Sequence, residues 1–326
     1  MKKFKIVGLF ILFQIIFIPL LSIVLIYYGP FTNLKEMIVT TAMTTMRHQY
    51  FATLFLSEGE IAEILEKNRP AQDIEEQNVE DIQVSKNNTN GIELVDVSSK
   101  TFKGYLLIVN DPSRVKLAVA PRLGEVGATT SQIVEHYDAV AGINAGGFQD
   151  DALGTGGKPD GIIISGGKLM TPNPKGNFSI VGLDTSNRML VSRSMSYPTM
   201  VNKKIRDAVS FGPTIIINGM PTIRSGNGGW GVQPRTAIAQ KKDGTILMLV
   251  IDGRQADSLG GTLKNVQDIL LQYGAYNAYN LDGGASSTMV YDSKVVNKPS
   301  DIMGERYVPC AFIVTNSTST DEVEVK

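Results

Sequence analysis

A run of apolar residues near the N-terminus sets the first constraint on this chain. Residues 6–28 contain no charged side chain, and Lys2, Lys3 and Lys5 precede them. A helix of that length, rising about 1.5 Å per residue, matches the roughly 30 Å hydrocarbon layer of a bilayer. Basic residues before the run favour a cytoplasmic N-terminus. We expect residues 1–31 to be a single-pass membrane anchor, with the remainder of the chain outside the cell.

A cleaved signal peptide is the alternative interpretation of the same run. Signal peptides carry an apolar region of about 7–15 residues followed by a cleavage site of small residues. The run here is longer, and the sequence Tyr-Tyr-Gly-Pro at residues 27–30 offers no such site. These features favour an uncleaved anchor.

Changes of sequence texture divide the rest of the chain. Residues 32–69 repeat apolar side chains at three- and four-residue spacing, which predicts a helical stalk. Residues 70–90 are polar and rich in acidic side chains, which is typical of a linker. A large domain is expected at 91–316, followed by a polar tail at 317–326.

Short runs of β-branched residues between Gly, Pro and Asn turns fill the large domain and predict strands. Residues 236–240 and 246–251 flank an Asp-Gly turn and predict a hairpin. A capping-box pattern at Thr129 and Gln132, and an apolar stripe over 262–273, predict two helices. We expect an α+β fold with a mostly antiparallel sheet core and flanking helices. The other expected strands are 104–109, 115–120, 161–164, 178–183 and 214–217.

Composition excludes several classes of function. The chain carries 31 basic and 32 acidic residues, so no overall positive field favours nucleic acid as a partner. A single cysteine, Cys310, rules out a disulfide within the monomer. The two histidines, His48 and His136, lie far apart in the sequence, which argues against a Ser-His-Asp triad.

Several segments end expected strands with small or polar residues, where loop-borne sites occur. The hairpin should bring Arg235 close to Asp252 and Arg254, and guanidinium groups bind phosphate oxygens in a bidentate fork. Residues 280–288 place Asp282 before two glycines and three hydroxyl side chains, an arrangement that suits anion binding or proton transfer. The glycine-rich segment 225–231 around Trp230 fits either a mobile lid or an ordinary loop.

These segments together resemble the phosphodiester glycosidase family over roughly residues 90–316. Ala285 replaces the family's usual third glycine, and Tyr307 stands where proline commonly follows Glu-Arg. The blocks that carry the resemblance are Ile-Asn-Ala-Gly-Gly-Phe at 143–148, Pro-Arg-Thr-Ala at 234–237, Asp-Gly-Arg at 252–254, Asn-Leu-Asp-Gly-Gly-Ala-Ser-Ser-Thr at 280–288, and Val-Asn-Lys-Pro-Ser-Asp at 296–301 followed by Glu305-Arg306.

The resemblance implies a hydrolase that splits a sugar from a phosphate which stays on the aglycone, without a cofactor. For an anchored external enzyme, a cell-envelope glycan or exopolysaccharide is the natural substrate. We expect Asp282 to act as nucleophile or general base, with Asp252 or Glu305 as the supporting carboxylate. The expected substrate and phosphate contacts are Asn144, Gly146, Gly147, Arg235, Arg254, Gly283, Gly284, Ser286, Ser287 and Arg306.

Three alternatives compete with this hypothesis. One is a non-catalytic glycan-binding module on the cell surface. Another is cleavage of the P–O bond with Ser286 or Ser287 as nucleophile, although no nearby His or Lys would activate such a serine. A third takes Asp252 and Asp282 as oxygen ligands of a divalent cation.

Overall fold

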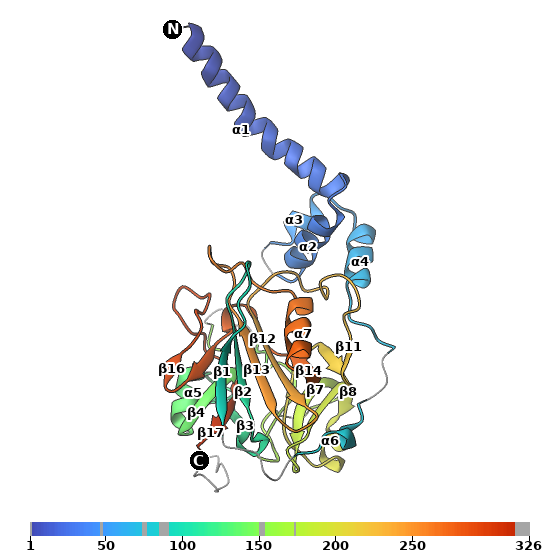
Figure 1. Ribbon diagram of the computed structural model, residues 1–326, viewed down its shortest axis with the longest axis vertical. Helices are drawn as coiled ribbons and strands as arrows, with labels where there is room; N and C mark the ends of the chain where they lie inside the picture. The colour runs from blue at the N-terminus through green and yellow to red at the C-terminus, as the bar shows by residue number, and fades with distance from the viewer. Residues whose placement is uncertain are drawn as a thin grey trace. The chain divides into compact units, whose positions relative to one another are not determined.

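The computed structural model describes residues 2–45, 48–73, 77–84, 91–149, 154–172 and 174–316, with side chains from residue 6 onward. The expected tail at 317–326 lies outside these residues. The chain forms two compact units (Figure 1). Unit 1 comprises Met1–Arg69 and Ser225–Gly231, and unit 2 comprises Pro70–Arg224 and Val232–Lys326.

Unit 1 is helical. Its first helix contains the 23-residue stretch Ile6–Tyr28, with a mean hydropathy of 2.9, long and apolar enough to cross a membrane as either an anchor or a signal sequence. The predicted helical segment 32–69 contains three shorter helices, which pack around Val39, Ala52 and Ile61. Ser57 caps the last of these helices in a reciprocal capping box with Glu60. The helices are α1 (Lys2–Tyr28), α2 (Thr32–Met43), α3 (Tyr50–Thr53) and α4 (Glu58–Lys67).

The glycine-rich segment Ser225–Gly231 packs on the helices of unit 1. The Asn227 side chain donates to Thr40 Oγ1 at 2.8 Å, and the Asn227 backbone N–H donates to Asn68 Oδ1 at 2.9 Å. A Cβ added at Gly231 would lie 2.2 Å from Thr41 Oγ1, so a close backbone approach requires glycine there. This segment is a packed part of the helical unit.

The described residues of the expected linker, 70–73 and 77–84, are hydrogen-bonded to unit 2. The Gln77 side chain donates to Met189 O at 2.6 Å and accepts from Val191 N at 2.6 Å. Arg193 donates to the carbonyl oxygens of Ala71 and Gln72. Polar composition here reflects side chains that bond to a strand edge.

The central sheet of unit 2 has seven strands in the order β1-β2-β13-β12-β14-β10-β11. Every pairing in it is antiparallel, and β13 is buried on both faces along its whole length. The strands are β1 (Ile92–Asp96), β2 (Gly104–Val109), β10 (Thr214–Ile217), β11 (Met220–Pro221), β12 (Arg235–Lys241), β13 (Ile246–Ile251) and β14 (Ala275–Asn280).

Two five-stranded antiparallel sheets complete the β-structure of unit 2, in the orders β16-β15-β4-β17-β3 and β6-β5-β9-β7-β8. The largest apolar cluster draws buried residues from all three sheets, among them Phe312, Val209 and Tyr279. The strands are β3 (Val115–Val119), β4 (Ala139–Asn144), β5 (Ile163–Ser165), β6 (Lys168–Leu169), β7 (Asn177–Asp184), β8 (Met189–Ser196), β9 (Ile205–Ser210), β15 (Met289–Tyr291), β16 (Lys294–Val295) and β17 (Cys310–Thr315).

Short helices flank the sheets of unit 2. Thr129 and Thr262 begin two of them with capping boxes, as the spacing at Thr129 predicts. The elements are α5 (Thr130–His136), α6 (Tyr197–Asn202), α7 (Leu263–Gln272) and the 3₁₀ turns η1 (Val79–Asp81), η2 (Pro112–Arg114) and η3 (Gly284–Ser286). The predicted α+β class with antiparallel sheets and an N-terminal apolar helix is confirmed.

Candidate active site

Strand register brings the ends of four strands together at one edge of the sheets. Arg235 at the start of β12 pairs with Ile251 at the end of β13, and Ala237 pairs with Asn280 at the end of β14. The segment after β14 then runs beside β12, because Gly284 N donates to Pro234 O at 2.9 Å. Asp282 N donates to Ala145 O at 2.9 Å, which joins the residues after β4 to the same place.

Three guanidinium groups interact pairwise at this edge, Arg235 with Arg254 and Arg254 with Arg306. Arg235 is 3% exposed, and its Nε donates to Gly261 O at 3.0 Å. Burial, and then the charge of Arg254, lower the pKa of Arg235 to about 9. Burial, and then the charge of Arg306, lower the pKa of Arg254. The guanidinium of Arg306 stacks 4.9 Å from the ring centroid of Phe148. Such mutual repulsion is relieved by a bound anion.

The Arg254 guanidinium lies against the loop that carries Asp282. A Cβ placed on Gly284 would be 3.3 Å from Arg254 Nη2, and Gly284 has a φ of +62°, so glycine is favoured at this contact. Gly283 is equally confined, since its Cβ would lie 2.8 Å from Pro234 O. The structure therefore brings Asp282, Gly283, Gly284, Arg235 and Arg254 together.

The other two predicted carboxylates have protein partners. Asp252 is 3% exposed and accepts from Asn297 Nδ2 at 2.8 Å and from Lys298 N at 3.1 Å. Burial raises the pKa of Asp252 above its ordinary value of 3.8, although these hydrogen bonds oppose the shift. Glu305 accepts from Ser131 N at 3.0 Å in the first turn of α5. Both carboxylates support the loops around the site.

Asn144 is fully buried at the end of β4, and its carboxamide binds three protein groups. Its Nδ2 donates to Asp282 O at 2.6 Å, while its Oδ1 accepts from Thr236 Oγ1 at 2.8 Å and from Thr288 N at 3.0 Å. The side chain thus connects β4, β12 and the Asp282 loop. These bonds give Asn144 a positioning role, and they use one of the two N–H groups of its amide, so its contact with a ligand stays a prediction.

Asn297 also positions the segments around the Asp282 loop through buried hydrogen bonds. It was not predicted as a site residue from the sequence. Its Oδ1 accepts from Met289 N at 2.7 Å, and its Nδ2 donates to Ser287 O at 3.0 Å as well as to Asp252. The side chain is buried. Its place in the 296–301 block could have indicated a role at the site. An asparagine before Lys-Pro is equally typical of a turn.

The remaining predicted contacts lie mostly in the interior. A Cβ on Gly146 would lie 2.6 Å from Val209 Cγ2, and one on Gly147 would lie 3.0 Å from the Phe211 ring, so both glycines admit neighbouring side chains. Ser286 and Ser287 are 2% and 1% exposed. Ser287 Oγ is buried without a hydrogen-bond partner among the described residues.

Among the residues that the structure describes, no group of three or more His, Cys, Asp or Glu side chains is arranged to hold a metal ion. A cation between Asp252 and Asp282 would have only two carboxylates, one of which already accepts from Asn297 and Lys298. The cation hypothesis stays a prediction, and hydrolysis that survives a chelator would remove it.

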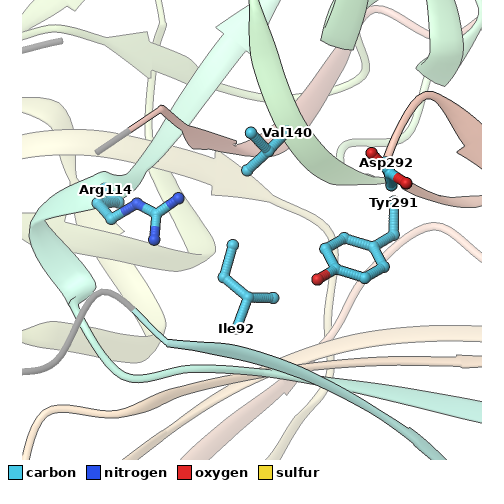
Figure 2. Close-up of a pocket in the computed structure, with 5 residues that line it drawn as sticks. All are labelled: Ile92, Arg114, Val140, Tyr291 and Asp292. Carbon is cyan, nitrogen blue, oxygen red and sulfur yellow. The ribbon is translucent and has the colours of Figure 1, made fainter. Parts of the chain in front are cut away.

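A pocket of about 290 Å³ lies at the opposite end of the β4-containing sheet, away from the arginines. Figure 2 shows Ile92 reaching between Arg114 and Tyr291. Arg114 Nε donates to Thr315 O at 2.9 Å and so connects the start of β3 to the end of β17. This buried arginine has a structural role at that end. The lining residues are Ile92, Arg114, Val140, Tyr291 and Asp292.

Comparison with protein families gives a match over residues 137–315, more than half of the chain, to the family described as phosphodiester glycosidase (NAGPA). The prophage-derived protein YomE of Bacillus subtilis is 26% identical over 202 residues, covering 59% of this chain and 30% of that protein. Bovine N-acetylglucosamine-1-phosphodiester alpha-N-acetylglucosaminidase is 36% identical over 70 residues, covering 22% of this chain and 13% of that enzyme. The chain thus spans less than a third of the length of these relatives.

Solved structures share the fold. The catalytic domain of the zebrafish N-acetylglucosamine-1-phosphodiester alpha-N-acetylglucosaminidase superposes with a TM-score of 0.58 at 21% identity, covering 72% of this chain and 86% of that one. A protein of Burkholderia pseudomallei K96243 superposes with a TM-score of 0.50 at 17% identity, covering 66% and 74% of the two chains.

Removing the Asn297 side chain should destabilise unit 2 strongly. An Asn297→Ala variant leaves Met289 N, Ser287 O and the Asp252 carboxylate short of a partner, which should cost about 2–4 kcal/mol of unfolding free energy. Urea denaturation of the full chain measures this. Lys294→Ala, on exposed β16, is the control and should stay within about 0.5 kcal/mol of the wild type. Equal effects of the two substitutions would contradict the positioning role.

The raised pKa of Asp252 predicts a pH dependence of stability. The folded state binds the proton of the Asp252 carboxyl group more tightly than the unfolded state does. The stability contributed by this proton is fully present below the ordinary pKa of 3.8 and is lost as the pH rises through the folded-state pKa. Asp252→Asn does not titrate at this position. Its unfolding free energy relative to the wild type should therefore increase between about pH 4 and about pH 7, as followed by urea denaturation. A difference that stays constant with pH would refute the assignment.

Proposed function

This chain belongs to the phosphodiester glycosidase family, and from that premise we propose that it hydrolyses a sugar 1-phosphodiester between the anomeric carbon and the phosphate oxygen. Water supplies the hydroxyl group of the released sugar, and its remaining proton goes to the phosphomonoester that stays on the aglycone. The names of the bovine and zebrafish relatives make N-acetylglucosamine the first sugar to test. A cell-envelope glycan or exopolysaccharide is the proposed natural substrate.

The contact between Arg254 and the Asp282 loop is the observation that best supports this proposal. The Arg254 guanidinium contacts Gly284, two residues after the half-buried carboxylate of Asp282. A sugar 1-phosphodiester needs positive charge at its phosphate and a carboxylate at the neighbouring anomeric carbon. We assign Asp282 the role of nucleophile or general base, and Arg235, Arg254 and Arg306 the role of holding the phosphate. Asp252, Glu305, Asn144 and Asn297 position the loops that carry these groups.

The leaving group explains why arginines replace the second carboxylate of an ordinary glycosidase. A phosphomonoester has a second pKa of about 6, so it leaves as an anion with little need for a general acid. Its growing charge needs fixed positive charge in a site of low dielectric. Guanidinium groups supply that charge without titrating near neutral pH.

Backbone strain at Arg254 gives independent support. Its φ is +59°, in the left-handed region where an arginine costs about 1–2 kcal/mol and where glycine or asparagine is favoured. Such strain persists only where the surrounding structure enforces it, and strained residues cluster at functional sites. The unusual conformation of Arg254 is therefore consistent with a role in binding the phosphate.

We also propose that α1 is an uncleaved anchor with a cytoplasmic N-terminus, which places unit 2 outside the cell. The length and hydropathy of residues 6–28 and the preceding lysines support this topology. Protease digestion of intact cells should remove unit 2 while leaving α1 in the membrane.

An Asp282→Asn variant should fold normally and lose hydrolysis. We expect kcat on an N-acetylglucosamine 1-phosphodiester to fall at least about a hundredfold, since the amide can neither attack nor take a proton. Circular dichroism checks the fold.

When the wild-type protein hydrolyses this compound in oxygen-18 water, the label should enter the sugar. Label in the phosphate would indicate P–O cleavage, and wild-type protein that binds the compound without turnover would indicate a glycan-binding module.

Arg254→Asn should separate stability from activity. Asparagine tolerates the left-handed backbone, so the unfolding free energy should equal or exceed that of the wild type by as much as about 1 kcal/mol. Loss of the charge should lower kcat/KM at least about tenfold.

The matched control is Lys204→Asn, at an exposed turn residue with a φ of 54°. It should give the same gain in stability with unchanged kcat/KM. If Arg254→Asn retained wild-type activity, Arg254 would have no part in phosphate binding.

A further inference from the structure

Two aliphatic side chains at one turn of unit 2 are more exposed than any large apolar side chain described in helix α1. Ile302 is 100% exposed and Met303 is 90% exposed, whereas the most exposed large apolar residue of α1, Leu9, is 69% exposed. Isolated exposed apolar residues are common. Nearly complete exposure of two adjacent apolar residues is not explained by packing within unit 2.

The conformation of this turn makes its composition unusual. Gly304 N donates to Asp301 O at 3.1 Å, so Ile302 and Met303 occupy the two central positions of a tight turn. Asp301 and Gly304 suit the first and last positions, and Asp301 Oδ1 also accepts from Met303 N at 3.0 Å. Central positions of turns in water favour Gly, Asn, Asp or Ser. The two aliphatic residues are dispensable for the turn itself.

Another exposed aliphatic residue, Leu259, lies on the neighbouring loop. Leu259 is 60% exposed on the loop after β13, and Gln255 Nε2 of that loop donates to Lys298 O at 2.7 Å. Tyr307, 45% exposed, follows Arg306 on the first loop. The loops that carry Arg254 and Arg306, joined by that hydrogen bond, thus also carry four exposed apolar residues, named here the apolar tip: Leu259, Ile302, Met303 and Tyr307.

We propose that the apolar tip docks unit 2 onto the surface of a lipid bilayer. A turn that projects its side chains fully into solvent has no concave wall to enclose a small ligand, but it can enter the boundary between headgroups and acyl chains. Tyrosine and basic side chains such as Lys298 and Arg306 suit the headgroup level. The N-terminal anchor proposed above would supply a bilayer for the tip to contact.

The docking has a consequence for the substrate, which rests on the proposed function. Because Arg254 and Arg306 lie on the two loops of the tip, docking holds the proposed phosphate site at headgroup level. Among cell-envelope compounds, the substrate class is then narrowed to a sugar 1-phosphodiester whose aglycone is a membrane lipid. Hydrolysis would leave the phosphomonoester on the lipid and release the sugar to the external solution.

The docking is tested on the full chain in phosphatidylcholine nanodiscs. Ile302→Cys is labelled with an environment-sensitive dye, and Cys310, being fully buried, does not compete for the label. Met220→Cys, at a residue 58% exposed on β11, is the matched control. Nitroxide groups on the lipid acyl chains should quench the dye at position 302 at least about twice as strongly as at position 220. Equal quenching at the two positions would overturn the docking.

The substrate class is tested with the double variant Ile302→Ser/Met303→Ser in the same nanodiscs. Its hydrolysis of a lipid-linked N-acetylglucosamine 1-phosphodiester embedded in the disc should fall at least about fivefold. Its hydrolysis of the soluble analogue, in which a methyl group replaces the lipid of the N-acetylglucosamine 1-phosphodiester, should change less than about twofold. Equal changes on the two substrates would overturn the substrate class. If the wild type hydrolysed neither, the proposed function would fail, while the quenching result would still decide the docking.

Discussion

The antiparallel pairing of β12 with β13 on one side and β14 on the other is the constraint on which the site depends. In such an arrangement the start of the middle strand meets the ends of both neighbours, so the segments that follow β13 and β14 emerge beside Arg235. All three strands are buried along most of their length. A slip of one residue would exchange the side chains of the two buried faces, so packing on both faces fixes the register that brings the Asp282 loop to the arginines.

Local patterns predicted the parts of this arrangement that depend on neighbouring residues. The Asp-Gly hairpin, the capping box at Thr129 and the helix over Leu263–Gln272 each follow from residues close in sequence. The division into three sheets does not, because pairings such as β4 with β17 join residues well over a hundred positions apart. For the same reason the protein partners of Asn144 could not be predicted from the sequence. An asparagine before two glycines at a strand end looks alike whether a ligand or Val209 and Phe211 fill the space beside the glycines.

Part of the expected linker at 70–90 makes contacts that polar composition alone does not predict. β8 lies at the edge of its sheet and would otherwise expose unpaired backbone groups. The Gln77 carboxamide accepts from one backbone N–H of β8 and donates to one carbonyl, as a neighbouring strand would. A polar residue therefore contributes to the sheet here without any apolar periodicity, and only the folded edge reveals its partner.

The cost of assembling the arginines also bears on how the site is built. Burial and mutual repulsion lower the pKa of Arg235 and of Arg254, and Arg254 adds backbone strain. None of this stabilises the fold, so the surrounding structure must hold the groups in place. The buried carboxamides of Asn144 and Asn297 do so by satisfying backbone groups on both sides of the Asp282 loop. In the proposed reaction, a phosphate would meet positive charge that the fold has already oriented, so little reorganisation would oppose the departure of an anionic leaving group.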